Sequence, residues 1–252
     1  MVGGTGDGLA MAHSQILRGF TQLGRQDDEA ARTAAVEAVR IAEAVDDGTL
    51  GLALHLLAIT ELDQTEARRV AEQAADHLER GGNLRSLARM WEDLAYTALL
   101  RGELDEARAL IGRSLARATD RAESVLALGL AGVIALESGD DADATRQFRN
   151  ALFAYRARGI TPGLSRVLLA LATRAAREGE TERAGRLLGA ATAMRSRRST
   201  PGDLEQRLEA QARALAAERC DPVTLERALH AGLRLTPPER IELGFEAARA
   251  GL

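Results

Sequence analysis

The sequence predicts an all-α protein built from repeated helical hairpins that stack as a right-handed superhelix, or solenoid, with a C-terminal helical cap. Hydrophobic residues make up 46% of the chain but aromatic residues only 3%. The core therefore consists mainly of Ala and Leu, which are strong helix formers. Turn glycines recur at Gly102, Gly139 and Gly179, with spacings of 139 − 102 = 37 and 179 − 139 = 40. Regular spacing of this size indicates a repeated pair of helices.

Two hairpins are expected at the N-terminus, after a disordered leader that covers residues 1–8. Gly24 breaks the first hairpin, and Asp27 or Asp28 caps its second helix, because a short acidic side chain accepts the free backbone amides at a helix start. The second hairpin turns at residues 61–64, which contain no glycine. The expected helices of this region span residues 9–23, 28–45, 50–60 and 65–80.

Residues 91–114 carry the clearest hairpin of the chain. Trp91 and Leu94 are large, Ala95 is small, and the turn residue Gly102 precedes a second helix. Small residues let antiparallel helices approach closely, while large residues fill the space beside them. This order resembles the tetratricopeptide repeat, whose pattern is W-x2-L-G-x2-Y followed by A-x3-F. The resemblance implies a superhelix whose concave surface is lined by the first helix of each hairpin.

Two further hairpins continue the pattern. Gly132 takes the small position, and Ala144 and Phe148 reproduce the A-x3-F element. About five tetratricopeptide-like hairpins therefore occupy residues 9–198, and residues 195–202 (R-S-R-R-S-T-P-G) are expected to form a linker. The expected helices of these two hairpins span residues 123–137, 143–158, 164–177 and 182–195.

Residues 199–252 depart from the hairpin pattern and are expected to cap the array. A repeat array needs a terminal cap with a polar outer face. Asp221 and Pro222 form a favourable N-cap and first helical residue, and Thr236 with Glu239 forms a capping box. The three expected capping helices span residues 203–218, 222–232 and 237–251.

Two C-terminal segments resemble the C-terminal repeat (sensor) region of large LuxR-type and antibiotic-regulator signal-transduction ATPases, which are bacterial transcriptional regulators. The segments are E-R-A-G-R-L-L-G-A-A at residues 182–191 and L-E-R-A-L-H-A-G-L-R-L-T-P-P-E-R at residues 225–240. The resemblance covers about residues 122–252 and implies a superhelix that senses an inducer or contacts a protein partner. The sequence contains neither a phosphate-binding loop nor a separate DNA-binding domain, so it represents either a sensor segment or a stand-alone relative.

Composition and charge weigh against several classes of protein. The formal net charge is −4 and all 33 basic residues are arginine. A broad basic footprint for nucleic acid and a phosphate-loop lysine are therefore both absent. Cys220 is the only cysteine, the four histidines lack metal-ligand spacing, and no long uncharged apolar stretch is present. The sequence predicts a cytoplasmic protein that is not an enzyme, has no cofactor or metal, and binds neither nucleic acid nor membrane directly.

Nine residues are expected on the concave surface when Trp91 is counted as the fourth repeat position. They combine apolar side chains with guanidinium groups that can hold a carboxylate in bidentate fashion. The candidate binding residues are Arg89, Glu92, Tyr96, Leu126, Val133, Leu136, Arg166, Thr173 and Arg177.

These features predict a non-catalytic regulatory module that binds a protein or peptide partner, or a small-molecule inducer, in transcriptional regulation. Two alternatives stay open. One is a peptide-responsive regulator that binds response-regulator proteins and assists their dephosphorylation, which requires a side chain able to position water at a phosphoaspartate. The other is a purely structural assembly scaffold or homodimer.

Overall fold

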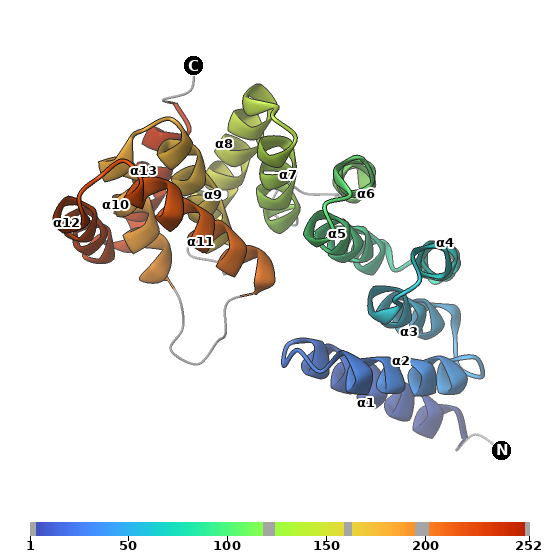
Figure 1. The fold of residues 1–252 in the computed structure, drawn as a ribbon. Helices are drawn as coiled ribbons and strands as arrows, with labels where there is room; N and C mark the ends of the chain where they lie inside the picture. Colours follow the sequence, from blue (N-terminus) through green and yellow to red (C-terminus); the bar gives the residue numbers. More distant parts are fainter. Residues whose placement is uncertain (1–3, 118–123, 159–162, 195–201, 250–252) are drawn as a thin grey trace. The chain divides into compact units, whose positions relative to one another are not determined.

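The computed structural model describes residues 4–117, 124–158, 163–194 and 202–249 (Figure 1). These described residues form thirteen α-helices and no strand, which confirms the prediction of an all-α protein. The chain divides into two compact units, Met1–Thr97 (unit 1) and Ala98–Leu252 (unit 2). The division falls within α5 (Leu84–Leu100).

Unit 1 contains two hairpins followed by most of α5. Its first four helices are α1 (Gly4–Leu23), α2 (Asp28–Ala42), α3 (Asp47–Thr60) and α4 (Gln64–Arg80). α1 packs against α2 and α3 packs against α4, while both α1 and α2 contact α3. The side chains of Asp27, Asp46 and Asp63 each accept a backbone N–H at the start of the following helix. These N-caps fix where α2, α3 and α4 begin.

The start of α1 and the end of α2 differ from the prediction, whereas the turn between them lies where it was expected. α1 begins at Gly4, so residues 4–8 of the expected leader are helical, and residues 1–3 lie outside the described residues. Gly8 lies beside the Val45 side chain, a tertiary contact that a glycine-rich composition does not reveal. α2 ends at Ala42, three residues earlier than expected. The left-handed residue of the turn before α2 is Gln26, with φ of 61°.

Small residues form much of the unit 1 core. Ala31, Ala35 and Ala38 on α2 are fully buried. Gly19 on α1 faces α3 so closely that a Cβ atom at this position would lie 2.3 Å from Leu56 Cδ2. Residues of this size permit the close approach of helices that the sequence predicts.

The first five helices of unit 2 continue the hairpin pattern. They are α6 (Leu104–Arg117), α7 (Val125–Glu137), α8 (Asp141–Arg158), α9 (Leu164–Arg177) and α10 (Thr181–Thr192). α7 packs against α8, and α9 packs against α10. A Cβ atom at Gly132 would lie 2.4 Å from Cδ1 of the buried Phe148, so the small residue of α7 lies directly against the large residue of α8. Gly102, Gly139 and Gly179 all have positive φ angles, between 75° and 83°, as the turns require.

Some of the predicted helix boundaries in unit 2 lie outside the helices of the structure. The helix expected over residues 182–195 ends at Thr192. The helix expected to begin at Glu123 starts at Val125, and residues 118–123 lie outside the described residues. The linker predicted at residues 195–202 also lies outside them, except for Gly202.

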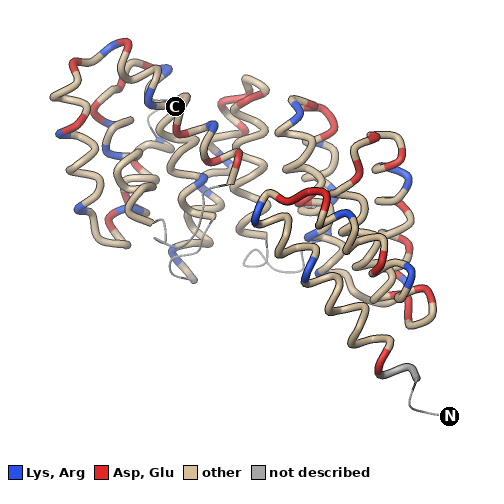
Figure 2. Tube along the Cα trace, turned by 60° about the horizontal axis from the view of Figure 1, so that its bottom comes forward, with Lys and Arg blue, Asp and Glu red and all other residues tan. Residues whose placement is uncertain are grey.

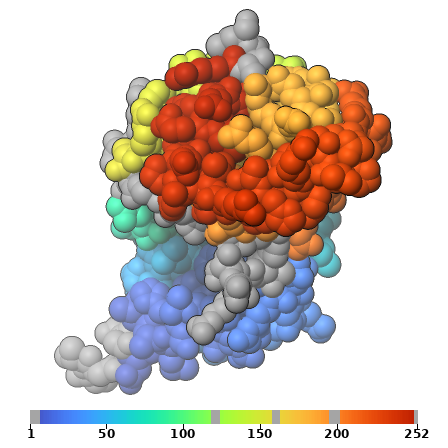
Figure 3. Space-filling view, turned by 90° about the vertical axis from the view of Figure 1, so that its left-hand side faces the viewer, coloured from blue at the N-terminus to red at the C-terminus, as the bar shows by residue number. Residues whose placement is uncertain are grey.

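Three C-terminal helices pack on the last hairpins of unit 2. They are α11 (Asp203–Ala217), α12 (Pro222–Leu233) and α13 (Pro237–Ala247). α11 lies along α9, α12 lies along α10, and α13 contacts α8, α9 and α10. Figure 3 shows α12 and α13 beside α10 on one face of the unit. α11 and α12 contact each other little, so these helices do not repeat the hairpin pattern.

Glycines bring α10 and α12 into backbone contact. A Cβ atom at Gly189 would lie 2.0 Å from the carbonyl oxygen of Leu229, and a Cβ atom at Gly232 would lie 2.0 Å from that of Arg186. No side chain larger than hydrogen can occupy these positions without moving a helix. The R-L-L-G-A-A and H-A-G-L segments of the sequence thus have a packing role.

A buried arginine attaches the end of α13. Arg174 is 3% exposed. Its Nη1 donates to Oγ1 of Thr145 on α8 at 2.7 Å, and its Nη2 donates to the carbonyl of Ala247 in the last turn of α13. Its Nε lies 3.7 Å from Oε1 of Glu178. A cation at a helix C-terminus satisfies free carbonyls and complements the helix dipole, so Arg174 links α8, α9 and α13.

Candidate functional site

The candidate binding site in unit 1 is centred on an ion pair on α5. Nε of Arg89 donates to Oδ1 of Asp93, one turn further along the helix, at 3.0 Å. The Arg89 side chain is 53% exposed, and its Nη groups make no hydrogen bond among the described residues. Glu92 is buried and Tyr96 is half-buried. Of the predicted residues on α5, Arg89 therefore presents an ordered guanidinium to solvent, whereas Glu92 and Tyr96 are wholly or partly covered.

A buried histidine on α3 completes this cluster. His55 is 2% exposed, and its Nε2 lies 3.3 Å from Oδ2 of Asp93, without the alignment of a hydrogen bond. The other side of the imidazole packs edge-on against Phe20 of α1, with 5.5 Å between the ring centroids. Contacts therefore run from α1 through α3 to α5.

Sequence reasoning treated each histidine as an isolated residue and so missed His55 and Asp93. The repeat spacing offered a signal, because 93 − 55 = 38 lies within the repeat step of 37 to 40 residues. Residues that are one repeat apart in the sequence occupy corresponding positions in neighbouring repeats. They can therefore meet, although the spacing alone does not say which pairs face each other.

The charged residues of this cluster stabilise each other's ionised forms. Burial raises the pKa of Asp93, but contact with His55 and Arg89 more than offsets this effect and leaves the pKa below its ordinary value. Burial also lowers the pKa of Arg89, but the charges of Asp93 and Glu92 raise it above its ordinary value. Arg89 is therefore a cation and Asp93 an anion at neutral pH, and the arrangement suits the binding of a charged group.

Two of the three predicted binding residues on α7 are buried. Val133 is fully buried and Leu136 is 2% exposed. Leu126 is half-buried, and its side chain packs against Gly163. The expectation that Val133 and Leu136 line an open surface is therefore corrected. α7 is apolar on nearly every side, and such helices are buried all round.

The predicted binding residues on α9 are engaged within unit 2. Nε of Arg166 donates to Oε1 of Glu205 on α11 at 2.8 Å, and both side chains are largely buried. Thr173 is fully buried, and its Oγ1 lies 3.2 Å from a backbone carbonyl of α11. Arg177 is partly exposed, with its Nη2 3.7 Å from Oε1 of Glu137. Arg166 and Thr173 therefore hold α11 in place, which corrects their assignment to an open groove.

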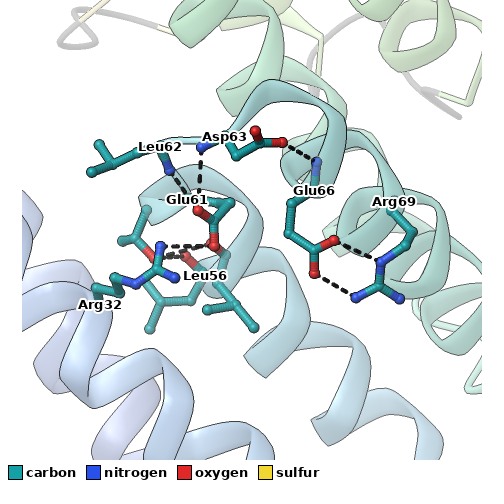
Figure 4. Close-up of polar contacts among 9 residues, drawn as sticks. Arg32, Leu56, Glu61, Leu62, Asp63, Glu66 and Arg69 are labelled. Carbon is teal, nitrogen blue, oxygen red and sulfur yellow. Dashed lines mark hydrogen bonds and ion pairs between the residues drawn. The ribbon is translucent and has the colours of Figure 1, made fainter.

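A second polar cluster fixes the turn between α3 and α4 (Figure 4). Oε1 of Glu61 accepts the backbone N–H groups of Leu62 and Asp63 at 2.9 and 3.2 Å. Oε2 of Glu61 pairs with Nη1 of Arg32 on α2 at 2.7 Å, a hydrogen bond that lowers the pKa of Glu61. Asp63 then caps α4 by accepting the N–H of Glu66 at 2.8 Å. These bonds shape a turn that has no glycine, so the cluster is structural.

The part of the chain that the structure describes offers no site for a metal ion. No three His, Cys, Asp or Glu side chains gather there in an arrangement that could hold one. Among the same residues, no helix is both long and apolar enough to cross a membrane. Acidic and basic residues are interspersed along the helices (Figure 2), whereas nucleic-acid binding uses a continuous basic patch or stripe.

No protein-family model matches the chain, and no curated protein matches it. The resemblances to tetratricopeptide repeats and to transcriptional regulators therefore stay predictions, and the function must be inferred from the geometry of the molecule.

Proposed function

We propose that this chain is a non-catalytic regulatory module that binds a protein or peptide partner on the side of unit 1 where α3 contacts both α1 and α5. In this proposal the hairpins are tetratricopeptide-like and stack as a right-handed superhelix, with their first helices on its concave side. The observation that carries the proposal is Arg89, whose guanidinium is held by Asp93 and exposed to solvent.

An arginine that is already oriented loses less side-chain freedom on binding than one that rotates freely. Arginine also forms planar, bidentate contacts with carboxylates, which makes it a common anchor at interfaces. Arg89 combines both properties, and Tyr96 lies within two turns of it on the same helix. This combination supports recognition of a partner more than it supports catalysis.

The contacts between helices suggest how binding would be transmitted. His55 lies between Phe20 of α1 and Asp93 of α5. A partner that binds Arg89 and displaces its side chain therefore also displaces Asp93. The contact between Asp93 and His55 passes this displacement to α3 and α1. In the proposed mechanism this changes the spacing of the first helices, and hence the curvature of the superhelix. The C-terminal resemblance makes transcriptional regulation the proposed setting.

Affinity capture with the full chain from a lysate of its source organism tests this proposal. Bound proteins and small molecules are identified together by mass spectrometry, for the unmutated chain, for Arg89→Ala and for the control Arg40→Ala. Arg40 is also exposed and paired within its own helix. We expect a protein partner that the unmutated chain and Arg40→Ala retain and that Arg89→Ala loses.

Other outcomes point to different functions. A partner retained equally by Arg89→Ala would show that the assigned surface is wrong. A small molecule retained in place of any protein would indicate an inducer sensor. Self-association alone, detected by scattering across a dilution series, would indicate a structural scaffold.

A further inference from the structure

Exposed hydrophobic side chains are concentrated on α1. Leu9, Met11 and Leu17 of this helix are all exposed, and Leu17 is 68% and Met11 55% accessible to solvent. Among the described residues, no other helix exposes more than one large hydrophobic side chain. Single hydrophobic residues are ordinary at a protein surface, whereas a group of them marks contact with another molecule.

The outward face of α1 has the spacing of a helix that packs on another helix. Five exposed residues follow one another at intervals of four and three positions, which places them in one stripe along the helix. They are Asp7, Met11, Ser14, Arg18 and Thr21. Ala10 and Leu17, which are also exposed, lie along one edge of this stripe. The buried side chains of α1, among them Ala12 and Ile16, point to the opposite side.

The stripe carries one charge of each sign. Asp7 and Arg18 are the only acidic and basic residues in the 20 residues of α1. Neither forms an ion pair or a side-chain hydrogen bond among the described residues. Figure 2 shows the helix largely tan between these two charges. They lie 18 − 7 = 11 residues apart, which is about three helical turns and leaves both on the same face.

We propose that α1 is the contact surface of a homodimer, in which α1 of one copy packs antiparallel against α1 of a second copy. In this arrangement Asp7 of each copy lies opposite Arg18 of the other, and a two-fold axis relates the two contacts. This inference goes beyond the proposed function, since it uses neither Arg89 nor α5.

The register that pairs the charges also pairs large side chains with small ones. Positions that face each other add up to 25, since 7 + 18 = 25. Met11 then faces Ser14 of the second copy, because 11 + 14 is also 25. Leu17 lies within one turn of Ala10 of the second copy, because 17 + 10 = 27 differs from 25 by only two positions. Small residues let the helices approach, and large ones fill the space beside them.

The charges also select the antiparallel orientation. Parallel helices in register would place Asp7 opposite Asp7 and Arg18 opposite Arg18, and like charges repel. At the end of the stripe, the hydroxyl of Thr21 already donates to the carbonyl of Leu17 at 2.7 Å. This hydroxyl therefore keeps a partner when a second helix excludes water.

The size of the surface predicts a reversible dimer. One helix from each copy covers less than the roughly 1,200–2,000 Å² that stable interfaces bury, and smaller interfaces are transient. We therefore expect a dissociation constant on the order of 10–100 μM.

Sedimentation equilibrium of the full chain between about 1 and 500 μM tests this proposal across the expected range. The mass should rise from that of a monomer to that of a dimer and no further, because a two-fold contact is closed. Leu17→Glu should stay monomeric. Leu62→Glu is the matched control, since Leu62 is 83% exposed but lies between α3 and α4, and it should dimerise like the unmutated chain. Circular dichroism checks that both variants fold.

A charge-reversal experiment tests the register. Asp7→Arg and Arg18→Asp should each weaken the dimer by about tenfold or more, because both symmetry-related pairs become repulsive. An equimolar mixture of the two variants should associate about as tightly as the unmutated chain, since every contact again joins opposite charges. The double variant Asp7→Arg with Arg18→Asp should recover for the same reason.

A chain that is monomeric throughout this concentration range would overturn the proposal. So would a dimer that Leu17→Glu leaves intact, or one whose affinity neither reversal changes, because its contact would lie elsewhere. Arg89→Ala should dimerise like the unmutated chain, and its failure to do so would overturn the assignment to α1. A captured partner that depends on Arg89 while the chain stays monomeric would leave the proposed function intact and reject this inference alone.

Discussion

Gly189 has no side chain, and this allows α10 to pack closely on α12. The space at Gly189 is closed by backbone atoms of Leu229, not by a flexible side chain that could rotate away. An added methyl group must therefore separate two helices. This makes Gly189 a position where the smallest possible substitution has a large effect on the C-terminal part of unit 2.

We expect Gly189→Ala to destabilise the protein by about 3 kcal/mol or more, because overpacking against a rigid backbone forces the helices apart. Gly112→Ala is the matched control. Gly112 also lies within a helix, but no atom within 4 Å would meet its added Cβ, so this variant should gain about 0.5–1 kcal/mol. Urea unfolding followed by circular dichroism measures both changes. Equal midpoints for the two variants would contradict the described contact.

Asp93 is expected to make the stability of unit 1 depend on pH in the acid range. Burial alone would raise its pKa, but His55 and Arg89 hold it below the ordinary value. A carboxyl group with a lowered folded pKa contributes stability above its unfolded pKa, about 3.9, and loses that contribution as the pH falls through the folded pKa. Asp93→Asn should therefore be less stable than the unmutated chain at pH 7, with a difference that shrinks below about pH 4.

Thermal unfolding of both proteins between pH 2 and 7 checks this expectation, with Asp28→Asn as a control at an exposed position on α2. A stability difference for Asp93→Asn that is the same at pH 3 and pH 7 would show that the contribution of Asp93 is not electrostatic.

At the scale of elements, α13 is attached by several contacts of different kinds. Phe245 packs against Phe153 of α8 with 4.8 Å between ring centroids. The guanidinium of Arg156 lies 5.2 and 5.0 Å from the centroids of these two rings. Arg174 donates a hydrogen bond to the carbonyl of Ala247 at the end of the helix. α13 therefore depends on side chains from both α8 and α9.

We expect Arg174→Met to loosen α13 selectively. The substitution removes two hydrogen bonds of a buried cation and leaves the Ala247 carbonyl without that donor, at a cost of about 2–3 kcal/mol. Hydrogen exchange should accelerate in residues 237–247 more than in α9 itself. Arg146→Met is the control, since Arg146 forms an exposed pair with Asp143 on the same helix and such pairs contribute about 0–1 kcal/mol. Uniformly faster exchange throughout unit 2 would contradict a local role.

The contact between α7 and α8 can be tested by a double-mutant cycle. Gly132→Ala places a methyl group against the Phe148 ring and should destabilise the protein by about 1–3 kcal/mol. The same substitution in a Phe148→Leu background should cost less, because the ring that obstructs the methyl group is gone. An interaction free energy of about 0.5 kcal/mol or more, from urea unfolding of the four proteins, is expected for residues in contact. Strict additivity would argue against the pairing.

At the scale of the whole molecule, charges are distributed as local pairs. Several basic residues pair with an acidic residue three or four positions away, as Arg40 does with Glu37 and Arg69 with Glu66. The formal net charge is −4. We therefore expect no binding to double-stranded DNA in gel-shift or anisotropy measurements at 50 mM salt. Binding that weakens steeply as salt is raised would contradict this, because it would reveal several phosphate contacts.

Much of the helical framework could be predicted because it depends on residues close together in the sequence. The glycines that turn the chain at 102, 139 and 179 and the caps at Asp221 and Thr236 follow from local spacing and residue type. The turn before α2 lies where it was predicted, between Leu23 and the cap at Asp27, but the sequence did not reveal that Gln26, and not a glycine, adopts its left-handed conformation. The start of α1 escaped prediction because its glycine-rich beginning suggested disorder.

The candidate site was predictable only in part. Arg89 is exposed on α5, but its placement on a concave face, which was counted from Trp91, stays a prediction. Whether Val133, Leu136, Arg166 and Thr173 are accessible depends on which other helices cover them.

The sequence by itself determined that the chain is all-α, where most helices begin and end, and which small residues sit between them, because these properties arise from local spacing and from residue size. Only the tertiary structure decided that His55 meets Asp93 and that α11 contacts Arg166 and Thr173. Burial and electrostatic partnership arise between residues that are distant in the chain, so they are fixed when the helices pack.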